Sequence, residues 1–267
     1  MCLLNKNKLG KKDCQTVIIY NIKIMEKTKF VRKHLLIVLS IFILGACTKD
    51  NKTEFEVHGD VVFIKKIIDG EPVVGTAYYA YSNKTLSSCI VTPPNSTESI
   101  NLSAFGINTL LFTHEPSNAE YTSSLPIEGN YLFNATSSDN ETVEISDEQS
   151  YYDLGFAQLD EKTFDTNNNW LHLTWGVITG VDNYTVSLIN SSGETIFNGY
   201  AVKADSPEFY ISTLLDVGIW TIQPTYNNTY TLRIKCFKYD TDATEDDYTY
   251  SVQEISQQDY SIVWKLN

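Results

Sequence analysis

Residues 170–189 read WLHLTWGVITGVDNYTVSLI, and no other stretch says as much about the fold. Apolar and polar side chains alternate on both sides of a turn at 179–182, which is the period-two pattern of strands with one buried face. The stretch therefore predicts two strands that each turn one face into a hydrophobic core. The residues expected on that face are Leu171, Leu173, Trp175, Tyr184, Val186 and Leu188.

A later strand extends this pattern after a turn around Pro224, and one of its faces is expected to hold Tyr230, Leu232, Ile234 and Cys236. The order resembles the fibronectin type III domain. That family has a core Trp on its second strand, a Tyr on its third, and a later strand that begins with a corner tyrosine. Trp175, Tyr184 and Tyr230 stand in those places.

The resemblance implies a β-sandwich of about 100 residues in which the Tyr230 hydroxyl bonds to backbone upstream. Cys236 is expected to point inward as a small hydrophobe. The connection at 214–228, LLDVGIWTIQPTYNN, is longer than the family pattern. A related immunoglobulin-like sandwich therefore stays open.

The first half of the chain shows short apolar runs separated by turn residues such as Asp69-Gly70-Glu71-Pro72. Strands at this spacing are typical of a sandwich or barrel. We therefore predict an all-β chain with two β-sandwich domains, at 55–147 and 148–267, the second with its core from about residue 170. In the first half, strands are expected at 55–68, 73–82, 87–92, 99–104, 109–113, 131–136 and 142–145.

The run LLIVLSIFILGAC at 35–47 has the layout of a secretory signal peptide behind a basic segment. It is too short to span a bilayer, which takes about 20 apolar residues. The polar residues Thr48-Lys49-Asp50 follow at once. Residues 1–46 are therefore predicted to be removed, and Met25 is the expected start of translation. The basic segment consists of Lys27, Lys29, Arg32 and Lys33.

Leu44-Gly45-Ala46-Cys47 resembles the bacterial lipobox. The resemblance implies that Leu44, Gly45 and Ala46 are read by the lipoprotein signal peptidase. It also implies that Cys47 carries the lipid, palmitate included, and that residues 47–54 form a tether. Lys49-Asp50 resembles the export signal of Bacteroidetes surface lipoproteins. The predicted location is the cell outer membrane, surface-exposed, with its periplasmic face as the alternative.

Charge is distributed unevenly along the chain. Residues 1–47 hold nine of the 20 Lys and Arg but only two of the 33 Asp and Glu, so the rest carries 11 basic and 31 acidic side chains. This excess of acid argues against a nucleic-acid partner, which needs a basic footprint. Beyond Cys47 only Cys89 and Cys236 remain, and they are expected to be buried free thiols in different domains.

The sequence offers little that points to catalysis. The His, Cys and Ser residues match no motif of metal binding, phosphate binding or nucleophilic catalysis. The acidic run at 240–247, DTDATEDD, lacks the Gly and the spaced Glu of an EF-hand loop, so a charged hairpin tip is the preferred interpretation over a calcium site. We therefore predict no catalytic residue, no metal and no cofactor.

Aromatic side chains are the remaining candidates for a binding site. Surface glycan-binding proteins stack sugar rings on exposed Trp or Tyr, although Tyr is also favoured in strands by propensity alone. The leading hypothesis is a non-enzymatic, lipid-anchored module that binds a glycan or a protein. The alternatives are a structural subunit of a surface or periplasmic complex and a small hydrolase with acidic residues. The candidate ligand-binding residues are Trp170, Trp220, Tyr79 and Tyr81.

Overall fold

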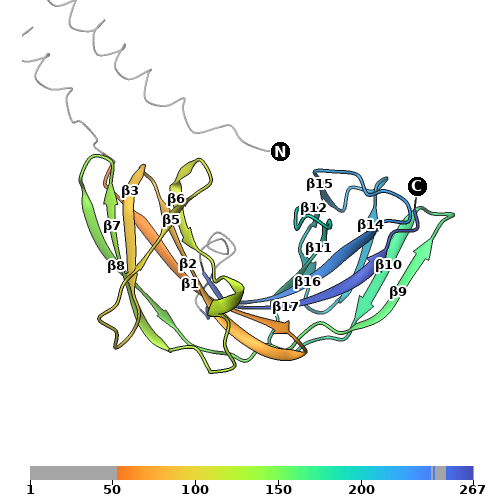
Figure 1. Ribbon diagram of the computed structural model, residues 1–267, viewed down its shortest axis with the longest axis horizontal. Helices are drawn as coiled ribbons and strands as arrows, with labels where there is room; N and C mark the ends of the chain where they lie inside the picture. The colour runs from red at the N-terminus through yellow and green to blue at the C-terminus, as the bar shows by residue number, and fades with distance from the viewer. Residues whose placement is uncertain (1–52, 242, 244–250, 267) are drawn as a thin grey trace, which may run out of the picture. The chain divides into compact units, whose positions relative to one another are not determined.

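The computed structural model describes residues 53–241, 243 and 251–266 (Figure 1). The lipobox and most of the acidic run at 240–247 lie outside these residues. The described chain consists of β-strands and one short 3-10 helix, η1 (Asn118–Glu120), and it has no helix long and apolar enough to cross a membrane. Residues 55–267 form one compact unit. The prediction of an all-β chain with two β-sandwiches is confirmed.

The second sandwich packs a three-stranded sheet against one half of a ten-stranded sheet. The order of the small sheet is β14-β10-β9, and the large sheet contributes β15-β12-β11-β16-β17. The small sheet consists of β9 (Leu159–Asp165), β10 (Trp170–Trp175) and β14 (Glu208–Ser212). The facing strands are β11 (Asn183–Ile189), β12 (Thr195–Gly199), β15 (Gly218–Trp220), β16 (Thr229–Tyr239) and β17 (Val252–Val263), and β13 (Val202–Lys203) pairs with β11.

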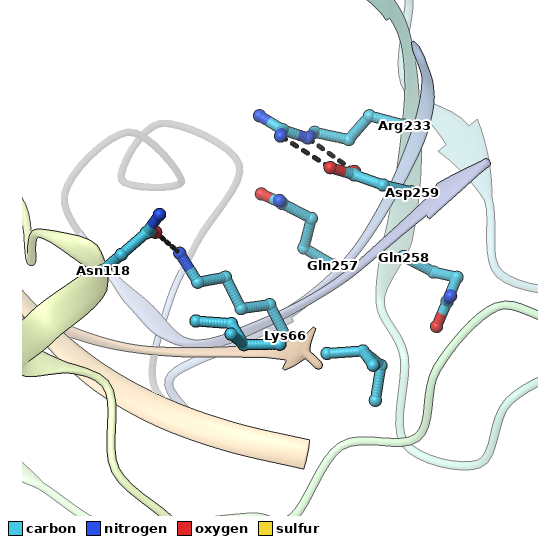
Figure 2. Close-up of a pocket in the computed structure, with 8 residues that line it drawn as sticks. Lys66, Asn118, Arg233, Gln257, Gln258 and Asp259 are labelled. Carbon is cyan, nitrogen blue, oxygen red and sulfur yellow. Dashed lines mark hydrogen bonds and ion pairs between the residues drawn. The ribbon is translucent and has the colours of Figure 1, made fainter. Parts of the chain in front are cut away.

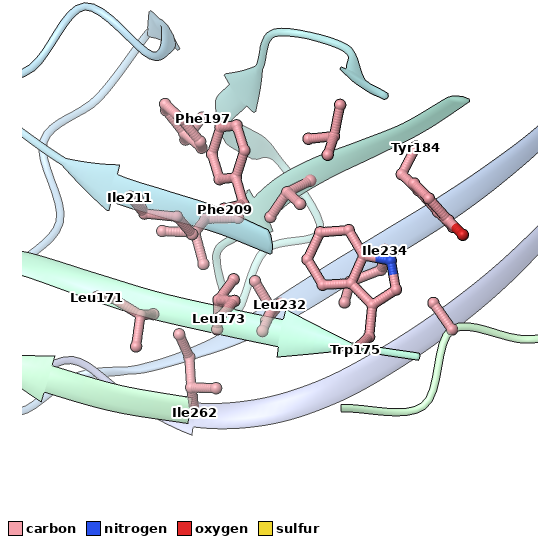
Figure 3. Packing of buried hydrophobic residues seen from close by; sticks show 14 of the residues in the cluster. Leu171, Leu173, Trp175, Tyr184, Phe197, Phe209, Ile211, Leu232, Ile234 and Ile262 are labelled. Carbon is pink, nitrogen blue, oxygen red and sulfur yellow. The ribbon is translucent and has the colours of Figure 1, made fainter. Parts of the chain in front are cut away.

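The core of the second sandwich follows the predicted alternation (Figure 3). The rings of Trp175 and Tyr184 meet edge to face at 5.3 Å between centroids. The backbone N–H of Thr225 donates to the Tyr230 hydroxyl at 2.8 Å, which is the upstream bond expected of a corner tyrosine. Cys236 is fully buried among these side chains. The three aromatic positions of the sequence pattern therefore hold the core and one of its corners.

The first sandwich uses the other half of the ten-stranded sheet and a separate four-stranded sheet, β4-β3-β7-β8. The large sheet contributes β1 (Val57–Ile68), β2 (Glu71–Ser82), β5 (Ser103–Phe105) and β6 (Asn108–His114). The small sheet consists of β3 (Leu86–Thr92), β4 (Ile100–Asn101), β7 (Gly129–Ser137) and β8 (Thr142–Gln149). The strand expected at 99–104 is split into β4 and β5, because the chain changes sheets at the buried Leu102.

The core of the first sandwich is centred on the fully buried rings of Phe63, Tyr131 and Phe133. Gly59 lies directly beneath Phe133, and a Cβ at this position would come within 2.7 Å of the ring. Any larger residue there would displace Phe133. Cys89 is buried in this core and Cys236 in the other, so both thiols are free, as expected.

Strands β1 and β17 pair in parallel and so join the two sandwiches into one sheet. The paired segments run from Phe63–Glu254 to Lys66–Gln257, and we call them the seam. Parallel neighbours need a long connection, and here nearly the whole folded chain lies between the two strands. Each half contains one large core, and a third, smaller cluster of Val62, Ala77, Val252 and Ile255 contains residues of both halves. The exact division between 147 and 148 stays a prediction.

A buried carboxylate fixes the connection between the halves to the seam. Glu254 is fully buried, and its two oxygens accept hydrogen bonds from the backbone N–H groups of Tyr152, Asp153 and Leu154 at 2.8–3.0 Å. Three N–H donors supply the partners that a buried carboxylate requires. Further along β17, the Tyr260 hydroxyl donates to the carbonyl of Ala157. The connection is thus bonded to β17 at several points, since the Ser256 hydroxyl also donates to the carbonyl of Gly155.

Candidate functional site

Three aromatic rings form a row on the outer face of the three-stranded sheet, and we call it the aromatic row. It consists of Trp170 and His172 from β10 and Tyr210 from β14. The imidazole of His172 stacks on Tyr210 with 4.3 Å between centroids and 11° between planes. Trp170 meets the same Tyr210 ring edge to face at 5.3 Å. Glu208 closes one end, with Oε2 3.3 Å from His172 Nε2.

Strand register places these rings together. His172 is directly opposite Tyr210 in the antiparallel pair, so both side chains lie on one face. Leu171 and Leu173 point to the opposite face, into the core. Trp170, His172 and Tyr210 are each partly exposed. Alternation therefore forces the row outward, where an apolar ring face with polar groups beside it can meet a ligand.

Tyr210 was missed by sequence reasoning although a signal for it exists. In Glu208–Ser212 the buried Phe209 and Ile211 flank it, so the same alternation places Tyr210 outward. Its pairing with His172 could not be read from sequence, because periodicity gives the face of a strand but not its neighbour.

Tyr79 and Tyr81 lie side by side on the face of β2 that turns away from the first core, with rings stacked at 6.3 Å between centroids. On this face Tyr79 packs against the small cluster that contains Val62 and Ala77. The Tyr79 hydroxyl donates to Glu115 Oε1 at 3.1 Å. Burial, and secondarily the Glu115 carboxylate, raises the pKa of Tyr79 above its ordinary value. Burial likewise raises the pKa of Tyr81, with a smaller contribution from Asp60. Both hydroxyls are therefore neutral donors at physiological pH.

Trp220 occupies a different setting, because it is partly buried and packs against the second core. Its ring lies 4.4 Å from that of Phe197 and 6.1 Å from that of Trp264, centroid to centroid. Its indole N–H donates to the carbonyl of Ser212 at 3.1 Å. The ring and its donor thus serve packing, while the predicted role in ligand binding stays a prediction.

The four predicted aromatics do not form one platform. Tyr79 and Tyr81 share a face of β2 in the ten-stranded sheet, whereas Trp170 belongs to the three-stranded sheet. Among residues 53–241, 243 and 251–266, no three His, Cys, Asp or Glu side chains are grouped so as to hold a metal ion. We therefore choose the aromatic row as the candidate site, because there the predicted residue Trp170 lies beside two further partly exposed rings.

Comparison with known proteins gives no family for this chain. No family model matches it, and no curated protein matches it. Among solved structures, a two-domain fibronectin type III segment of chicken tenascin is 13% identical, with 79% of this chain and 97% of that chain covered and a TM-score of 0.26.

Two further structures are similar at the same level. A tetra-tandem repeat from the extending region of a large adhesion protein is 11% identical, covers 78% of this chain and 49% of its own, and has a TM-score of 0.24. The BSP domain of a biofilm-associated protein is 10% identical, covers 84% and 54% respectively, and has a TM-score of 0.24. At such TM-scores these likenesses decide nothing about this chain, whose fold assignment rests on its own strand order.

Proposed function

We propose that this chain is a non-enzymatic lipoprotein, anchored to the outer membrane through Cys47 and displayed on the cell surface, that binds a glycan. The anchor is supported by the lipobox at 44–47 and the signal-peptide layout before it. Acyl chains contribute about 0.8 kcal/mol per buried CH₂, so a multiply acylated cysteine holds the protein on the membrane.

The observation that carries the binding role is the aromatic row. Trp170 and Tyr210 are partly exposed on a sheet face, at an edge-to-face distance of 5.3 Å, with the polar pair His172 and Glu208 beside them. Sugar rings have apolar faces that pack on aromatic rings and hydroxyls that bond to such polar groups. The row offers both, on adjacent strands of a rigid sandwich.

The binding role is tested by calorimetric titration of neutral oligosaccharides, namely maltoheptaose, cellohexaose and xylohexaose. We expect at least one to bind and the double variant Trp170→Ala, Tyr210→Ala to bind about 30-fold more weakly, which corresponds to about 2 kcal/mol. The matched control is Tyr226→Ala, since Tyr226 is 54% exposed outside the row. Equal affinity in the two variants would place the site elsewhere.

The location is tested by protease treatment of intact cells followed by detection of the body of the protein. Digestion of unbroken cells is expected, because the proposed anchor leaves the sandwiches outside the membrane. Protection until the outer membrane is opened would contradict surface display and favour the periplasmic face. A Cys47→Ala variant should lose membrane attachment in either case.

A structural subunit of a surface or periplasmic complex is the second candidate. Each small sheet has two edge strands, and one of them, β9, consists largely of exposed residues and pairs with β10 of the aromatic row. Such an edge can accept a strand from another chain. Co-purification of a stoichiometric partner, together with no response to any of the three sugars, would favour this function over glycan binding.

A further inference from the structure

Three cations gather on one face of the ten-stranded sheet at the seam. Lys66 on β1 is opposite Gln257 on β17, and Gln257 is opposite Lys235 on β16. Residues in register on neighbouring strands share a face, so these side chains form one row across three strands. Arg233, two residues before Lys235, lies on the same face. A chain with 31 acidic and 11 basic side chains after residue 47 thus concentrates three of those cations at one place.

A cleft of about 400 Å³ opens beside this row (Figure 2). Its volume lies within the range of pockets that bind small ligands. Cationic, amide and aliphatic groups line it together, and among the residues that the structure describes Asp259 is the one carboxylate in the lining. The lining residues include Lys66, Asn118, Arg233, Gln257, Gln258 and Asp259.

The charges at the cleft are unevenly compensated. Arg233 is paired with Asp259 through two hydrogen bonds of 2.8 Å. The Lys66 ammonium instead donates to the neutral Asn118 Oδ1 at 2.9 Å and lies 3.5 Å above the Tyr121 ring. Within the described part of the chain, no hydrogen bond or ion pair reaches the Lys235 ammonium.

The electrostatic surroundings of both lysines agree with this geometry. Burial lowers the pKa of Lys66, and the nearby Arg233 lowers it further. The same two causes lower the pKa of Lys235, with Glu115 and Asp259 acting in the opposite direction. The Arg233 guanidinium therefore repels each of the two ammonium groups, and an anion bound beside them would relieve that repulsion.

We infer that the cleft at the seam binds the anionic group of an acidic sugar, such as the carboxylate of a uronic acid, at Lys66. The Lys66 ammonium lines the cleft and holds the charge. Lys235 lies beside the cleft on the same face of the sheet, on the other side of Gln257, and adds to the positive potential. The amides of Asn118, Gln257 and Gln258 are available for sugar hydroxyls, and Ile67 and Ile68 supply an apolar wall. This site is separate from the aromatic row, so either can fail while the other stands.

The test is calorimetric titration of glucuronate, with glucose as the matched neutral sugar and sodium sulfate as a competitor, at low ionic strength. Glucuronate is expected to bind, whereas glucose at the same concentrations is expected not to bind. Sulfate should compete with glucuronate for the site. The double variant Lys66→Gln, Lys235→Gln should weaken glucuronate binding at least about tenfold. Added salt should also weaken binding, since the attraction is electrostatic.

The control Lys162→Gln removes an exposed cation from β9, which is not among the strands at the cleft. It should leave glucuronate binding unchanged. The double variant removes the repulsion among the cations at the seam even when no ligand is bound. It should therefore fold with an undiminished melting temperature. No glucuronate binding by the unmodified protein, equal binding of glucose, or equal loss in the control would each overturn the inference.

Discussion

The two sandwiches bury their apolar side chains in different ways. The second core is built around the indoles of Trp175 and Trp264, with Tyr184 against the first of them. The first core contains no Trp and relies on Phe63 and Phe133, with Gly59 letting a strand approach the Phe133 ring. A core marked by large aromatics at fixed strand positions can be recognised from sequence, whereas a core that depends on close approach cannot.

The two cores are also connected through the ten-stranded sheet. Strand β1 belongs to the first core and β17 to the second, and the two strands pair at the seam. We therefore expect the cores to unfold together despite their different construction. Perturbations of either core and of the seam probe this expectation.

Loss of a central ring from either core should have the largest effect. Trp175→Ala and Phe133→Ala each leave a cavity at a fully enclosed site, which should cost about 3–5 kcal/mol of unfolding free energy. Calorimetry should show one transition at a lower temperature in both variants. Two resolved transitions, with only one of them shifted, would mean that the cores are independent.

A substitution at the seam should lower the free energy of unfolding by a smaller amount. Glu254→Ala leaves three backbone N–H groups of the connection without their acceptor, which should cost about 2–4 kcal/mol. Denaturant titration measures this loss. The exposed Glu161→Ala on β9 serves as the control and should stay within about 0.5 kcal/mol of the unmodified protein.

The smallest change is expected from a substitution of Asp60, which should increase the stability of the folded protein. This carboxyl is 2% exposed, and burial together with Asp147 and Asp240 raises its pKa well above the ordinary value. The folded protein therefore keeps the proton to higher pH than the unfolded chain does. Stability should fall as pH rises from about 4 through the raised pKa.

Asp60→Asn should remove the part of that decline that Asp60 causes, because an amide oxygen can still accept the N–H of Val252 without carrying charge. At pH 8 the variant should be more stable by about 1 kcal/mol, or about 2–4 °C in melting temperature. Melting curves from pH 4 to pH 8 measure the difference. A variant whose stability declines with pH as steeply as that of the unmodified protein would show that Asp60 is not the titrating group.

Much of the fold could be predicted from local pattern. Alternation placed Leu171, Leu173 and Trp175 in the core correctly, and the corner position of Tyr230 predicted its upstream hydrogen bond. These features depend on neighbours close in sequence. The site was predicted only in part, because Trp170 was identified without its partner Tyr210.

The seam could not be predicted, because strand periodicity says which face is buried but not which strand lies alongside. Phe63 and Glu254 are adjacent across nearly the whole folded chain, and no local signal links them. For the same reason the sequence could not predict the row of cations at the seam. Its members Lys66 and Lys235 lie far apart in the sequence and come together only through strand pairing. The splitting of 99–104 into two strands also depends on a tertiary event, the burial of Leu102 between sheets.

Amide hydrogen exchange tests the shared sheet most directly. If the seam joins both cores, the backbone amides within 63–66 and 254–257 that bond across it should exchange only through global unfolding, as slowly as those of the central strand β16. Their exchange free energies should then fall together in the Trp175→Ala and Phe133→Ala variants. Fast exchange at the seam while β16 stays protected would contradict the account, because the two sandwiches would then be separate bodies in contact.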